Sequence, residues 1–252
     1  MKLQDKVALI TGASQGMGEA IATRFAKEGA AVAVIASSSL DKAQAVAGKL
    51  SGGAKAYVCD VRSTAAVADT VDQVLRDFGR IDILVNAAGV FYPTPAGTTE
   101  EADLDRMVDI NLKGTWKTIN AVAPGMKAQK YGKILNISSV AGVMGLGTFG
   151  VYCATKAGII MMTRALACEL APHGININCI APGNTATPMN ENIRTQPEFK
   201  EFLDFMAART PSGRTYSTVE DMANIALLLC SEDGRAMHGS HVLADEGFSA
   251  GI

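Results

Sequence analysis

The stretch Tyr-Cys-Ala-Thr-Lys places a phenol and an amine four residues apart, at Tyr152 and Lys156. On a helix, residues i and i+4 lie side by side on one face. If that face lines a pocket, the ammonium group favours the phenolate and lowers the tyrosine pKa from its reference value of about 10, which makes an acid–base catalyst. On a solvated helix the same pair is an ordinary surface contact. Chance alone gives such a spacing in roughly one chain in four of this composition, so the pair needs support from other motifs.

A glycine-rich segment, TGASQGMG, runs from Thr11 to Gly18 directly after a predicted strand. Glycines let a backbone turn tightly and approach a pyrophosphate, which the N-terminus of the next helix attracts through its dipole and free N–H groups. The spacing is G-x-x-x-G-x-G, and its place between a strand and a helix is the context that such a motif requires. We interpret it as a nucleotide phosphate site, and a plain tight turn is the alternative.

The end of the second predicted strand indicates which dinucleotide binds. An acidic residue at this place would bind the ribose 2′-hydroxyl of NAD. The chain instead has Ser37 and Ser38, followed by Ser39, and the first acid is Asp41. Small hydroxylated side chains leave room for a 2′-phosphate and donate hydrogen bonds to it, although no arginine stands there to add charge. We therefore expect NADP(H), with NAD(H) as the alternative.

Short β-branched runs alternate with helical patterns along the whole chain. Strands that alternate with helices and read as continuous apolar runs indicate a parallel sheet covered on both faces. No linker divides the chain, so we expect one doubly wound (Rossmann) α/β domain over residues 1–252 with seven parallel strands. The expected strands are 7–11, 31–36, 56–59, 81–86, 133–138, 175–178 and 241–244. The expected helices are 17–27, 41–50, 63–78, 100–126, about 152–170 and 219–229, with an irregular polar stretch at 183–214.

Composition excludes several classes of function. The net charge is −2 with both signs interspersed, so no basic face for nucleic acid is evident. No apolar run approaches the ~20 residues of a membrane span, and no signal peptide precedes the first strand, so we expect a cytoplasmic protein. The 5 cysteines are scattered without a metal-binding spacing, so no metal site is expected.

Taken together and in order, these motifs resemble the short-chain dehydrogenase/reductase family over essentially the whole chain. The further elements are Asp60-Val61, the NAAG segment at Asn86–Gly89, and Asn111. Ser139 stands 13 residues before Tyr152, which is the family interval.

The resemblance implies a role for each catalytic residue. Tyr152 would be the general acid in reduction and the general base in oxidation. Lys156 would lower its pKa and hold the nicotinamide ribose. Ser139 would hydrogen-bond the substrate oxygen. Asn111 would support a water chain that returns protons through Lys156.

The resemblance also implies the cofactor contacts. Asp60 and Val61 would contact adenine, Asn86 and Gly89 the adenosine ribose side, and the segment after Pro182 the nicotinamide end. The complete expected set, besides Tyr152 and Lys156, is Gly12, Ser14, Gln15, Gly16, Met17, Gly18, Ser37, Ser38, Asp60, Val61, Asn86, Gly89, Pro182, Gly183, Thr185 and Thr187. The chain departs from the family pattern where Gln15 replaces a basic residue common in NADP-dependent relatives, where Ala87 replaces Asn, and where Thr185 replaces Ile or Val.

We expect a substrate lid at about 184–214, facing Met144, Leu146 and Phe149 across a moderately apolar pocket. The partner would be a small-molecule carbonyl or alcohol. A 3-oxoacyl chain on acyl carrier protein is one candidate, docked on Lys127, Lys130 and Lys133, beside small ketones, sugars and polyols. Relatives are commonly homotetramers, so a homotetramer is expected. The alternative function is a non-catalytic nucleotide-sensing protein, against which the retained Tyr152 and Lys156 argue.

Overall fold

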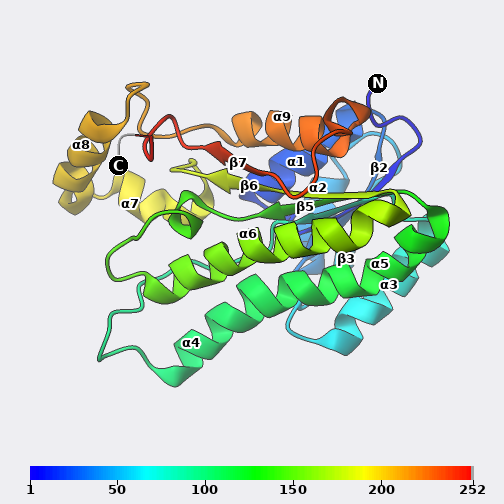
Figure 1. Cartoon of the computed structure of the whole chain (residues 1–252), viewed down its shortest axis with the longest axis horizontal. Coiled ribbons are helices and arrows are strands. Elements are labelled where there is room, and N and C mark those ends of the chain that lie inside the picture. The colour runs from blue at the N-terminus through cyan, green and yellow to red at the C-terminus, as the bar shows by residue number, and fades with distance from the viewer. Residues whose placement is uncertain (251–252) are drawn as a thin grey trace.

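The computed structural model describes residues 1–250 and contains a seven-stranded sheet in the order β3-β2-β1-β4-β5-β6-β7 (Figure 1). Every neighbouring pair of strands is parallel. The strands are β1 (Val7–Thr11), β2 (Ala31–Ala36), β3 (Lys55–Val58), β4 (Ile83–Asn86), β5 (Gly132–Ile137), β6 (Ile175–Pro182) and β7 (His241–Ala244). The predicted doubly wound parallel sheet is confirmed.

Helices cover both faces of the sheet. Figure 1 shows α1 and α9 on one side and α5 and α6 on the other. The helices are α1 (Gly16–Lys27), α2 (Leu40–Ala47), α3 (Thr64–Phe78), α4 (Glu101–Val108), α5 (Thr115–Gln129), α6 (Gly150–Leu170), α7 (Glu191–Thr195), α8 (Lys200–Arg209) and α9 (Val219–Cys230). One apolar core lies under α1, α2 and α9, and a second lies under α3, α5 and α6.

The sequence explains these elements locally. The central strands are buried along their whole length, as their continuous apolar runs require. Helix α3 turns Val67, Val71 and Val74 toward the core, and burial of each such side chain contributes roughly 1.5–3 kcal/mol. The helix begins after Ser63, whose side chain accepts a hydrogen bond from the Ala66 N–H as the predicted N-cap.

The predicted helix 100–126 is interrupted. Between α4 and α5 lies a π-helical segment, η1 (Asp109–Gly114), which contains Asn111. Such wide turns inside helices are frequent at functional sites. A Cβ on Gly114 would lie 2.7 Å from Val61 Cγ2, so glycine lets η1 approach the segment that follows β3.

The prediction of an irregular stretch at 183–214 was wrong. β6 continues to Pro182, and α7 and α8 follow, separated by a 3-10 turn at Pro197–Phe199. Met206 is the only buried residue of α8, so the segment lacks the broad apolar stripe that identifies a core-facing helix. Among residues 1–250, no helix is long and apolar enough to span a bilayer.

Candidate active site

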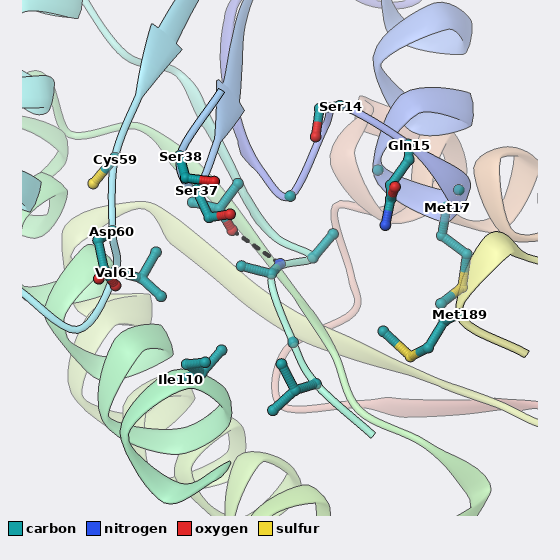
Figure 2. Close-up of a pocket in the computed structure, with 18 of the residues that line it drawn as sticks. Ser14, Gln15, Met17, Ser37, Ser38, Cys59, Asp60, Val61, Ile110 and Met189 are labelled. Atoms are coloured by element: carbon teal, nitrogen blue, oxygen red, sulfur yellow. Dashed lines mark hydrogen bonds between the residues drawn. The ribbon is translucent and has the colours of Figure 1, made fainter. Parts of the chain in front are cut away.

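A groove of about 360 Å³ lies beyond the carboxyl ends of β1 to β4. In an open α/β sheet this edge holds the ligand, at the point where the strand order reverses. Here the reversal falls between β1 and β4, which are direct neighbours. Figure 2 shows the groove running from Asp60 and Val61 at one end to Met17 and Met189 at the other.

The glycine loop after β1 forms one wall of this groove. Gly12 has φ +65°, and a Cβ there would lie 2.8 Å from the Ala88 N atom, so only glycine lets the loops after β1 and β4 come so close. A Cβ on Gly18 would lie 2.4 Å from the Gly12 carbonyl oxygen. The loop residues expected to bind the cofactor all line the groove, namely Gly12, Ser14, Gln15, Gly16, Met17 and Gly18.

The serines after β2 have different roles. Ser39 caps α2 by accepting a hydrogen bond from the Lys42 N–H. Ser37 and Ser38 are exposed and line the groove (Figure 2), so their hydroxyls are directed to whatever fills it.

Two arginines that sequence reasoning missed also line this groove. Arg62 lines the groove, and its side chain donates three hydrogen bonds to the Asp60 carboxylate, from Nη2 to Oδ2 at 2.7 Å and from Nε to each oxygen at 3.0 Å. The hydrogen bonds from Arg62 hold the pKa of Asp60 below its usual value, so the carboxylate stays charged. Arg106 reaches the groove from α4. It stands far from the strand ends in sequence, so no local pattern connects it to them.

The residues expected to contact the adenosine do not all line the groove. Asp60, Val61 and Gly89 line the groove, whereas Asn86 does not. Its Nδ2 donates to Asn136 Oδ1 at 2.9 Å, and its Oδ1 accepts from Thr118 Oγ1 at 2.6 Å. The Asn86 side chain therefore ties β4 to β5 and α5, and its amide is not directed into the groove.

A second cavity of about 160 Å³ adjoins the groove, and Ser139 and Tyr152 both line it. Ser139 follows β5 directly and accepts a hydrogen bond from the Ala141 N–H. Tyr152 lies in the first turn of α6. A residue at the end of a strand and a residue at the start of a helix thus line the same cavity.

The expectation of a net lowered pKa at Tyr152 was wrong for this structure. Burial raises the pKa of Tyr152 to about 12, and the nearby Ser139 hydroxyl acts in the opposite direction without reversing the shift. Lys156 Nζ lies 5.6 Å from the centroid of the tyrosine ring and donates to the Ile137 carbonyl oxygen at 2.8 Å. Tyr152 therefore keeps its proton at neutral pH.

Lys156 is itself buried, and burial lowers its pKa to about 8. Asn111 is fully buried beside it: a Cβ on Gly89 would lie 3.3 Å from Asn111 Oδ1 and 3.8 Å from Lys156 Nζ. Asn111 Oδ1 accepts from the Val90 N–H at 2.8 Å, and Asn111 Nδ2 donates to the Val90 carbonyl at 3.0 Å. Asn111 therefore fixes the loop after β4.

The segment after β6 closes the other side of the second cavity. Pro182, Gly183, Thr185 and Thr187 all line it. A Cβ on Gly183 would lie 2.7 Å from Asp245 Cα, so only glycine lets the two backbone segments come this close. Thr185 Oγ1 is buried without a hydrogen-bond partner.

These features fit a dinucleotide. The glycines clear a path for a pyrophosphate, Ser37 and Ser38 offer hydroxyls, and the buried, unpaired Thr185 Oγ1 suits a polar group such as a carboxamide.

The proposed docking lysines do not flank this site. Lys133 is buried near the start of β5, at the opposite edge of the sheet from Ser139, and donates to Asn176 Oδ1 at 2.9 Å. Lys127 pairs with Glu169 at 2.9 Å. The expectation that a basic patch of these residues lies beside the site was wrong.

The sheet order, the glycine loop and the groove are typical of a dinucleotide-binding domain of the Rossmann class. Residues 12–249 match the family model described as Enoyl-(Acyl carrier protein) reductase. The 3-oxoacyl-acyl-carrier-protein reductase of Thermotoga maritima is 37% identical over 98% of this chain and 99% of its own. A hydroxy(phenyl)methylsuccinyl-CoA dehydrogenase subunit of Thauera aromatica is 40% identical over 95% of this chain and 94% of its own.

Among solved structures, gluconate 5-dehydrogenase of Burkholderia cenocepacia, in complex with NADP and tartrate, matches with a TM-score of 0.92 and 31% identity. The match covers 100% of this chain and 98% of that one. The chain belongs to the short-chain dehydrogenase/reductase family, whose members are NAD(P)-dependent oxidoreductases of alcohols and ketones.

Proposed function

We propose that the protein reduces a ketone to a secondary alcohol with NADPH, using Tyr152 as the proton donor. The observation that carries this proposal is the shared cavity: Tyr152 and Ser139 both line it, and Tyr152, whose pKa burial raises to about 12, carries a proton at neutral pH. A protonated phenol suits reduction, in which the developing alkoxide must receive a proton.

Each side chain then has a defined task. The glycine loop with Ser37 and Ser38 would hold NADPH, which would supply the hydride for the carbonyl carbon. Ser139 donates a hydrogen bond to the carbonyl oxygen, and Tyr152 transfers its proton to that oxygen as charge develops there. Lys156, when charged, stabilises the phenolate that remains. Asn111 positions the loop after β4 through its two hydrogen bonds to Val90.

The preference for NADPH over NADH rests on the end of β2. Ser37 and Ser38 are exposed there without an acidic neighbour on the strand end. Arg106 supplies positive charge along the same groove, whereas Arg62 is paired with Asp60; this positive charge favours an additional phosphate. Titration with both cofactors tests the preference, and equal dissociation constants would contradict it.

We further propose that residues 184–214 act as the lid, because Met189, Asn190 and Met206 reach the second cavity from this segment.

A homotetramer is supported by Trp116 on α5 and Met161 on α6, which are 47% and 60% exposed. Light scattering in solution tests the assembly. A cytoplasmic location agrees with five free cysteines.

Tyr152→Phe tests the catalytic role. The variant should lose turnover by about 100- to 10,000-fold, the usual contribution of a general acid, while the NADPH dissociation constant changes less than about twofold. Initial rates would be measured over a panel of 3-oxoacyl thioesters, diketones and keto-sugars. Tyr131→Phe is the matched control, because Tyr131 lies at the opposite edge of the sheet, directly before β5. Unchanged turnover in Tyr152→Phe would refute the mechanism.

A further inference from the structure

Most of the large side chains that line the cavity around Tyr152 are apolar. Within residues 1–250, no charged side chain lines it. Seven large apolar side chains do, and they come from six separate segments of the chain. They are Met17, Phe91, Met144, Leu146, Met189, Met206 and Phe248.

The polar side chains of the same wall are largely occupied by contacts within the protein. Ser138 Oγ donates to the Lys156 carbonyl at 2.8 Å. Asn190 Oδ1 accepts from the Thr187 N–H at 3.1 Å, and its Nδ2 donates to the Thr185 carbonyl at 2.9 Å. Besides the catalytic hydroxyls, the groups left to bind polar substituents are the Asn184 amide and Thr185 Oγ1, and the second of these suits the cofactor carboxamide.

This inventory excludes two kinds of substrate on energetic grounds. Each sugar hydroxyl buried without a partner costs about 1–3 kcal/mol. A carboxylate or phosphate buried without a cation costs more. A polyol, a keto-sugar or a small keto acid would leave such groups unpaired against methionine and phenylalanine side chains.

The aromatic residues of the wall are held in a fixed arrangement. The Phe91 ring stacks on Phe149 with centroids 4.5 Å apart and an interplanar angle of 6°. It also meets the Tyr152 ring edge-on, at 4.8 Å and 72°. Since Asn111 fixes the neighbouring Val90, Phe91 is positioned from both sides beside the proton donor. Methionine sulfur and an aromatic ring both make favourable contacts with a further aromatic ring.

We propose that the substrate is an uncharged ketone flanked by an apolar ring, and that Phe91 is the residue that selects this ring. The proposal rests on the proposed ketone reductase function and names its substrate class.

A matched pair of compounds isolates the effect of charge. Ethyl benzoylformate and benzoylformate share the ketone and the phenyl ring, but only the second is an anion. With NADPH, kcat/KM for the ester should exceed that for the acid by at least about 100-fold, because the cavity offers the carboxylate no cation. The keto-sugar xylulose should be reduced more slowly than the ester. Leu146→Arg, which adds a cation to the wall, should lower the ester-to-acid ratio at least about tenfold.

A second pair isolates the ring. The ratio of kcat/KM for 1-phenyl-1,2-propanedione to that for 2,3-butanedione should fall about 3- to 10-fold in Phe91→Leu, the size of a lost aromatic contact. Phe205→Leu is the control, since Phe205 is 55% exposed on α8 and does not line the cavity. The NADPH dissociation constant and melting temperature of each variant report whether it is folded.

The outcomes separate the two proposals. Faster reduction of benzoylformate or xylulose than of the ester would overturn the substrate class while leaving the reductase function intact. An unchanged ring preference in folded Phe91→Leu would overturn the role of Phe91. Binding of NADPH without turnover of any ketone in the panel would overturn the reductase function, and the substrate class with it.

Discussion

The pKa of Lys156 predicts how catalysis depends on pH. Burial lowers this pKa to about 8, so the side chain is charged below that pH and neutral above it. The charged fraction falls from about 0.9 at pH 7 to about 0.1 at pH 9. If only the charged form supports Tyr152, kcat/KM for ketone reduction should be level near pH 7 and fall about tenfold by pH 9. Tyr152, with a pKa of about 12, stays protonated through this range and adds no limb.

Lys156→Arg separates this explanation from others. Arginine stays charged to a much higher pH even when it is buried. Whatever its absolute rate, the variant should therefore lack the decline between pH 7 and pH 9. Lys127→Arg is the matched control, since Lys127 pairs with Glu169 away from the site, and it should keep the wild-type profile. The assay is the initial rate of NADPH oxidation at subsaturating ketone, because kcat/KM reports the groups of the free enzyme. A decline near pH 8 that persists in Lys156→Arg would refute the assignment of that limb to Lys156.

Three further predictions address binding and stability. Gly12→Ala should weaken NADPH binding, measured by titration, and lower the free energy of unfolding by about 2 kcal/mol or more, measured by denaturant melts. The reason is that Gly12 has φ +65° and that the alanine Cβ would lie 2.8 Å from the Ala88 N atom. Asn111→Ala should lower the free energy of unfolding by about 1–3 kcal/mol, since it leaves the part-buried Val90 N–H and C=O without their partner; a loss under about 0.5 kcal/mol would contradict that reading. Ser37→Asp should weaken NADPH binding at least about tenfold and leave NADH binding equal or stronger, because a carboxylate repels a 2′-phosphate and accepts from a 2′-hydroxyl; an unchanged ratio of the two dissociation constants would contradict the role given to Ser37.

The π-helical segment η1 shows a limit of sequence reading. The pattern from 100 to 126 predicted a continuous helix, and its ends are close to the ends of α4 and α5. The wide turn at Asp109–Gly114 depends on contacts distant in sequence: Asn111 with Val90, and Gly114 with Val61. The local pattern of apolar residues cannot predict contacts between residues that are distant in sequence.

Local patterns were sufficient for the sheet. Continuous apolar runs and glycines at the end of the first strand depend only on neighbouring residues, and the strand ends that they mark hold the groove. The ordered motifs also indicated the short-chain dehydrogenase/reductase family, which the comparisons confirm.

Only the tertiary structure decided the electrostatics and the walls of the site. The Tyr152–Lys156 spacing predicted a lowered tyrosine pKa, but burial raises it, because desolvation depends on everything packed around the phenol. Arg106 reaches the groove, and Lys133 is buried away from the site, through packing between distant segments. A sequence specifies which groups the chain carries and their local spacing, whereas the solvent and charge around each group are set by residues brought together when the sheet and helices pack.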